Sequence, residues 1–158
     1  MDNLEVKFYD TVADSLLKFA VIISQSNGKW VFCKHKERDT YEVPGGHREA
    51  GENILETAKR ELQEETGAIK FDIKLVCVYS VTGKTRVNDT GEESFGGLYF
   101  AEISEFAKEL HSEMEKVVLM DELPDNWTYP LIQPKLIEKY LQIERQTYSK
   151  IQLAQSKL

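Results

Sequence analysis

The sequence predicts a fold of the α/β (α+β) class, in which strands alternate with two helices. Three features predict it. Short β-branched and apolar runs lie between turn residues, residues 53–66 are rich in helix formers, and apolar residues recur at helical spacing from about 131 to 153. A chain of 158 residues can bury a core without disulfides, so we expect one domain over residues 1–158.

The first strands are expected to form a hairpin. Residues 19–24 are apolar and β-branched, residues 25–28 end in Asn-Gly, and residues 30–35 form the return strand. Further strands are expected at residues 71–81, 97–103 and 116–120.

A helix is expected over residues 53–66, which contain no glycine or proline. Gly67 should end it, because glycine readily adopts the left-handed conformation of a helix C-terminus. One apolar stripe of this helix is suited to packing on a sheet. Its residues are Leu55, Ala58, Leu62 and Thr66.

The neighbouring stripe carries three carboxylates, those of Glu61, Glu64 and Glu65. At these spacings the carboxylates repel one another, so a positive group should compensate. The simpler interpretation is a solvated acidic face partnered by Lys59 and Arg60. The preceding loop, residues 41–46, favours a ligand instead, because its Pro-Gly-Gly backbone can approach a ligand closely and expose a carbonyl.

Carboxylate and carbonyl oxygens suit a hard divalent cation, and the sequence has no thiolate or imidazole cluster that would favour zinc. We therefore expect Mg²⁺ (or Mn²⁺) as the cofactor, bridging to a polyphosphate. Such ions neutralise phosphate oxygens and activate a water for in-line attack at phosphorus.

Residues 46–68 read GHREAGENILETAKRELQEETGA, which is the order G-x5-E-x7-R-E-L-x-E-E-x-G-A. This order resembles the signature of the Nudix hydrolases, with every defining position filled. The resemblance implies an α/β/α sandwich around a mixed central sheet, a catalytic loop-helix-loop and a C-terminal helix. It also implies metal-dependent hydrolysis of a nucleoside diphosphate linked to a further group.

The resemblance also implies roles for single residues. The metal ligands would be Gly45 through its carbonyl, Glu61, Glu64 and Glu65. Glu61 would also activate water, and Arg60 and Glu52 resemble the pair that orients the catalytic helix. Many members add a distant glutamate, for which Glu113 is favoured over Glu115; solvated loop glutamates are the alternative for both.

Sequence markers of other Nudix substrates are absent from the segments on either side of this motif, residues 46–68. ADP-ribose hydrolases usually show a proline where this chain has Gly83, and no dinucleoside polyphosphate or coenzyme A marker is seen. The loop before this motif resembles that of MutT-type 8-oxo-dGTP diphosphatases, which release a nucleoside monophosphate and pyrophosphate. By that resemblance Lys34 and Asn126 are candidate substrate contacts. A solvated strand-end lysine is the alternative for Lys34, and the register around Asn126 is open.

The net charge and the distribution of apolar residues limit the kinds of partner expected for this protein. The net charge of −7 argues against a broad nucleic-acid surface but not against a nucleotide substrate. No segment is long and apolar enough for a membrane span, and the N-terminus lacks the blocks of a signal peptide. Cys33 and Cys77 lie in apolar runs as reduced core residues, so we expect a cytoplasmic protein, monomeric or homodimeric.

Two other functions remain open from the sequence. One is removal of pyrophosphate from 5′-triphosphorylated RNA, which the acidic balance disfavours. The other is a non-catalytic nucleotide-binding domain on the same fold, which the complete set of glutamates disfavours.

Overall fold

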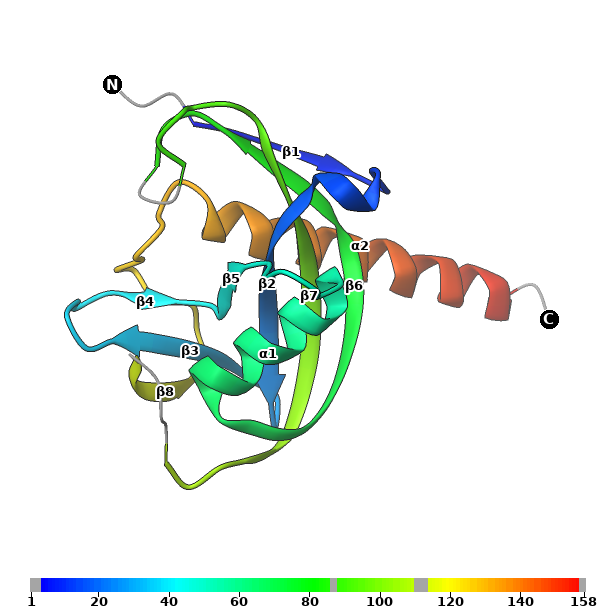
Figure 1. Cartoon of the computed structure of the whole chain (residues 1–158). Helices are drawn as coiled ribbons and strands as arrows, with labels where there is room; N and C mark the ends of the chain where they lie inside the picture. The colour runs from blue at the N-terminus through cyan, green and yellow to red at the C-terminus, as the bar shows by residue number, and fades with distance from the viewer. Residues whose placement is uncertain (1–3, 86–87, 110–113, 157–158) are drawn as a thin grey trace.

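A mixed sheet forms the centre of the computed structural model, which describes residues 4–85, 88–109 and 114–156 (Figure 1). Eight strands run in the order β1-β6-β7-β2-β3-β4, while β5 pairs with β2 and β8 with β3. The β2–β7 pair is parallel and the other pairs are antiparallel. The strands are β1 (Glu5–Tyr9), β2 (Leu17–Ser26), β3 (Lys29–His35), β4 (Tyr41–Glu42), β5 (Gly45–His47), β6 (Ala68–Thr82), β7 (Ser94–Phe106) and β8 (Met114–Met120).

The β2–β3 hairpin turns at Asn27 and Gly28, whose φ angles are 52° and 76°. Positive φ at both turn residues matches the right-handed twist of paired strands, and Asn-Gly adopts it at low cost. The hairpin expected from residues 25–28 is therefore confirmed.

Helix α1 (Ile54–Thr66) begins one residue after the expected start, with Asn53 as its N-cap, and ends at Thr66 as expected. The Asn53 side chain accepts a hydrogen bond from the Glu56 backbone N–H, and the Glu56 side chain accepts one from the Asn53 N–H. This capping box satisfies two backbone donors that the helix start would leave unpaired. Gly67 ends the helix with φ at 74°.

The expected apolar stripe of α1 was wrong at one position. Leu55 is 38% exposed, and Ile54 is buried in its place. Ile54, Ala58 and Leu62 recur every four residues and face the sheet, which turns Leu55 about 100° away from it. Glu65, which the sequence places on the neighbouring acidic stripe, is also buried, so the alternative of a solvated acidic face does not hold for this residue.

Two apolar clusters cover the two faces of the sheet. One contains Ile22 of β2 with Ala58 and Leu62 of α1. The other contains Ile23 with Leu136 of helix α2 (Gln133–Ser156). Adjacent strand residues point to opposite faces, so β2 contributes to both clusters. The helices therefore lie on opposite faces, which confirms the α/β/α arrangement (Figure 1).

Helix α2 starts at Gln133 and ends at Ser156, a shift of two or three residues from the expected range of about 131–153. The Tyr140 ring stacks on that of Phe100 at 4.6 Å, which anchors the first half of the helix on β7. The last turns extend past the sheet, and Tyr148 is 63% exposed (Figure 1).

Four short elements, three strands and a 3-10 helix, were not expected from the sequence. Strand β1 pairs with β6, β4 ends two residues before Pro44, and β5 contains the two glycines of the Pro-Gly-Gly segment. Strands of two or three residues are too short to show alternation, so only pairing reveals them. A short 3-10 helix, Asp14–Leu16, leads into β2.

Both cysteines, Cys33 and Cys77, are buried free thiols, as expected. Within the described ranges, no helix has the length and hydropathy needed to cross a bilayer.

Candidate active site

The Pro-Gly-Gly loop is held against the start of β2 and the end of α1. The Ile22 N–H donates to the Pro44 carbonyl at 2.9 Å, and Gly45 pairs with Val21. The Gly45 N–H donates to Glu65 Oε1 at 3.0 Å. The loop carries no bulky side chain at this point, so its backbone lies directly beside the acidic end of α1.

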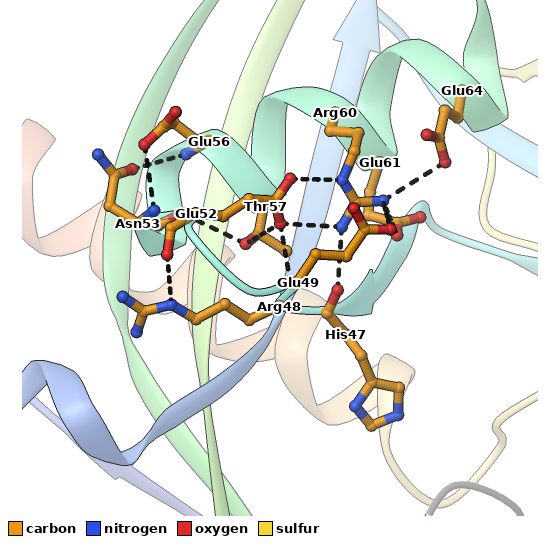
Figure 2. A network of polar contacts seen from close by, with 10 residues as sticks. All are labelled: His47, Arg48, Glu49, Glu52, Asn53, Glu56, Thr57, Arg60, Glu61 and Glu64. Carbon is orange, nitrogen blue, oxygen red and sulfur yellow. Dashed lines mark hydrogen bonds and ion pairs between the residues drawn. The ribbon is translucent and has the colours of Figure 1, made fainter.

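Arg60 lies at the centre of the acidic network in Figure 2. Its Nε donates to Glu52 Oε2 at 2.6 Å, and one terminal nitrogen donates to Glu61 Oε1 at 2.7 Å. The other terminal nitrogen donates to the His47 carbonyl and to Glu52 Oε1, both at 3.0 Å. Glu64 lies at 3.5 Å. Arg60 is therefore a compensating cation of the glutamate cluster, and it also joins α1 to strand β5.

Glu52 is held by more than Arg60. The Thr57 hydroxyl donates to its Oε1 at 2.9 Å, and the Glu49 N–H donates to the same oxygen at 3.0 Å. Hydrogen bonds to the charged carboxylate, above all from Arg60, lower the pKa of Glu52 to about 2. Glu52 is thus ionised at neutral pH and fixes the position of the arginine.

The surroundings of Glu65 shift its pKa in the opposite direction from that of Glu52. Its side chain is buried, and desolvation raises its pKa to about 9. The Gly45 N–H opposes this shift, whereas the neighbouring Glu61 carboxylate adds to it. Burial and Glu61 also raise the pKa of Glu64, against the pull of Arg60. Burial and crowding at the acidic end of α1 therefore disfavour the ionised forms of Glu64 and Glu65 in the absence of a cation.

We tested this donor set for a divalent cation. In the part of the chain that the structure describes, no three Asp, Glu, His or Cys side chains converge on one point. Glu61 and Glu64 turn toward Arg60, while Glu65 turns toward the Gly45 N–H. The chemistry nevertheless fits, because all donors are oxygens and a cation would favour the ionised Glu65 carboxylate against the burial and the Glu61 charge that raise its pKa.

The Glu61 carboxyl group lies directly against Gly46, where a side chain would collide with it. A Cβ added at position 46 would overlap the Glu61 carboxyl group. Only glycine at this position lets the strand and the carboxylate approach so closely.

A cavity of about 450 Å³ opens beside the Pro-Gly-Gly loop, within the range of roughly 300–1,000 Å³ that is usual for small-molecule sites. Its aromatic lining comes from Phe19, His47, Tyr79 and Tyr129. The Phe19 and Tyr79 rings lie 5.5 Å apart in a tilted arrangement, and His47 lies edge-on to Phe19 at 6.3 Å. Gln133, at the start of α2, supplies a polar group to the same wall.

The two substrate-contact candidates lie together, away from this cavity's lining. Lys34 forms an ion pair with the Asp39 carboxylate at 3.7 Å. The Asn126 side chain donates to the Asp39 carbonyl at 2.7 Å, and its own carbonyl accepts from the Tyr41 N–H. Both are therefore tied to the segment between β3 and β4.

The distal glutamate candidate, Glu113, lies outside the described residues. Glu115 belongs to strand β8. Phe19 and Gln133 were not singled out from the sequence, because an apolar strand residue and a helix-start glutamine are common in any core. Their meeting at one cavity is visible only in the fold.

The family model of the NUDIX domain matches residues 15–140, and the chain belongs to this family. It is 34% identical over 126 residues to "Putative 8-oxo-dGTP diphosphatase YtkD" of Bacillus subtilis (strain 168), covering 79% of this chain and 75% of the relative. The crystal structure of the Bacillus subtilis pyrophosphohydrolase BsRppH is similar over 92% of both chains, with 28% identity and a TM-score of 0.74. A UDP-X diphosphatase structure shares the fold, at 19% identity over 87% of this chain and 66% of the other, with a TM-score of 0.67.

Family and relatives together make this chain a Nudix hydrolase that cleaves phosphoanhydride bonds, a class that generally uses divalent metal cations and acts on nucleotides. The non-catalytic alternative is set aside.

Proposed function

We propose that this chain is a Mg²⁺-dependent (or Mn²⁺-dependent) pyrophosphohydrolase of nucleoside triphosphates, including oxidised ones such as 8-oxo-dGTP. It would release a nucleoside monophosphate and pyrophosphate. The crowded Glu61–Glu65 pair carries this proposal, because Gly45 and Gly46, which contact these two carboxylates, also line a cavity of about 450 Å³. The relative named for 8-oxo-dGTP hydrolysis supports the oxidised substrate.

The cation would be held by oxygen donors that surround the end of α1. These are the Gly45 carbonyl and the carboxylates of Glu61, Glu64 and Glu65, with Glu113 as a further candidate. When bound, such an ion neutralises phosphate oxygens and lowers the pKa of a water molecule.

Side chains of the protein would accept the proton, position the helix and contact the substrate. Glu61 would accept the proton of the attacking water, since its carboxylate lies against Gly46 of the Pro-Gly-Gly loop and is oriented by a 2.7 Å hydrogen bond from Arg60. Arg60 and Glu52 would act as positioning residues that keep α1 against strand β5. Phe19 and Tyr79 would exclude water from the base, and Lys34 and Asn126 would contact a part of the substrate outside the cavity.

A second candidate substrate is a 5′-triphosphorylated RNA, which presents the same phosphoanhydride bond. The likeness to the pyrophosphohydrolase BsRppH over nearly the whole chain favours keeping it. The net charge of −7 favours the free nucleotide. We also propose that residues 1–158 form one domain, which acts in the cytoplasm as a monomer or homodimer.

Pyrophosphate release from a panel of canonical and oxidised dNTPs, NTPs and a short 5′-triphosphate RNA tests this proposal. We expect turnover of at least one free triphosphate with Mg²⁺ and none with chelator present. Turnover of the RNA alone would support the second candidate. No release from any triphosphate would refute both.

A further inference from the structure

Gln133 presents a hydrogen-bond donor that the proposed reaction does not explain. Its side chain is 5% exposed and lines the cavity beside the Pro-Gly-Gly loop. Its Oε1 accepts from the Val43 backbone N–H at 2.9 Å. Because an N–H group can only donate, the amide oxygen must face Val43, which leaves the Nε2 group for another partner.

No such partner is present among the described residues, whose hydrogen bonds leave Nε2 of Gln133 unpaired. The residue is also fixed at its backbone, since its N–H donates to the Tyr129 carbonyl at 3.0 Å. Among the described side chains only Ser24 Oγ is fully buried without a partner, so Nε2 of Gln133 is open to the cavity, where a rigidly held donor favours a ligand group that can accept from it. This wall of the cavity therefore favours a ligand that carries a hydrogen-bond acceptor.

The rest of this wall suits a flat ring. The Phe19 ring lies over Gly96, where a Cβ would overlap it, and leans on Tyr79. Aromatic faces fixed in this way favour a planar heterocycle such as a nucleobase.

We propose that Gln133 is a specificity-determining residue, which donates from Nε2 to a ring carbonyl oxygen of the bound base. This inference rests on the proposed function, in which the cavity takes the base of a nucleoside triphosphate. A base with a carbonyl at this position, such as guanine, hypoxanthine or uracil, accepts the bond. Adenine or cytosine places an amino group there instead, so that two donors face each other.

Inosine and adenosine triphosphates test this inference most sharply, because their bases differ only in the carbonyl or amino group at C6 and the N1 proton that accompanies it. We expect the wild-type kcat/KM for ITP to exceed that for ATP by at least about fivefold, the size of one net hydrogen bond. Equal values would overturn the proposal.

Gln133→Glu supplies the matching variant. It keeps an oxygen for the Val43 N–H but replaces the donor Nε2 with a second oxygen. We expect the ITP/ATP ratio to fall by at least about fivefold, since the new oxygen accepts from the amino group of ATP. Gln142→Glu is the control, because it makes the same charge change at an exposed position of α2 and should leave the ratio unchanged.

Binding separates this inference from the proposed function. The dissociation constants of IMP and AMP, measured by calorimetry, require no hydrolysis. If no triphosphate is cleaved but IMP binds more tightly than AMP, and Gln133→Glu removes the preference, Gln133 keeps its role and the proposed function fails. If triphosphates are cleaved but neither ratio responds to Gln133→Glu in a folded variant, the role of Gln133 is refuted. Thermal unfolding of each variant establishes that it is folded; if Gln133→Glu does not fold, the wild-type ratios decide.

Discussion

Glu52 Oε2 lies 2.6 Å from Nε of Arg60, and this pair joins the loop before α1 to the middle of the helix. Arg60 in turn contacts Glu61 and the His47 carbonyl. The residue that neutralises the acidic cluster is therefore also the one that fixes the helix against strand β5.

Glu61→Gln should lower kcat by roughly 10²- to 10⁴-fold, because it removes the proposed proton acceptor. The fold should be retained or slightly stabilised, since Glu61 is one of the charges that raise the Glu65 pKa. Steady-state kinetics and thermal unfolding measure the two effects. Glu122→Gln, at an exposed position, should change neither. Unchanged kcat in Glu61→Gln would move the base elsewhere.

The Glu52–Arg60 pair should make stability depend on acid pH. The folded pKa of Glu52, about 2, lies below its ordinary value of 4.5, so the pair contributes stability above about pH 4.5. This contribution should be lost progressively as the pH falls from 4.5 toward 2. Denaturant unfolding across that window should show a steeper pH dependence for wild type than for Glu52→Gln. Parallel curves would contradict the assignment.

Mg²⁺ should raise the melting temperature, because an ion held by the glutamates of α1 binds the folded chain in preference to the unfolded chain. Glu65→Gln removes one of the proposed oxygen ligands, so its melting temperature should respond less to Mg²⁺ than that of wild type. Melting curves with Mg²⁺ and with EDTA test this. Glu138→Gln, exposed on α2, is the matched control and should respond as wild type. An equal response of the Glu65 variant would place the ion at another site.

Gly96→Ala should displace the Phe19 ring, because the added Cβ overlaps that ring. We expect a loss of stability of about 1–3 kcal/mol from overpacking. KM should rise more than kcat falls, since the cavity wall moves while the glutamates remain. Kinetics with the best triphosphate of the panel and chemical unfolding test this. Phe19→Leu in the Gly96→Ala background should recover part of the stability, and a lack of recovery would point to another clash.

Local sequence predicted the elements that local chemistry controls. The Asn27-Gly28 turn, the start of α1 at Asn53 and its end at Gly67 depend on neighbouring residues and were placed correctly. Strands β4 and β5 were missed because so few residues show no periodicity. Leu55 was misplaced because two apolar residues, Ile54 and Leu55, start the helix and only the sheet decides which one it buries.

The sequence by itself determined the chemistry available to this protein: a hard-oxygen cluster on one helix, a glycine loop before it and an arginine within it. Only the tertiary structure decided the surroundings of each group, and with them its pKa. Glu52 and Glu65 are both glutamates of the motif at residues 46–68. Contact with Arg60 nevertheless lowers the pKa of Glu52, whereas burial raises that of Glu65. The cavity beside them likewise arises from Phe19 and Gln133, which lie more than a hundred residues apart. A pKa depends on surrounding charge and solvent, and a cavity depends on packing, so both are properties of the folded chain.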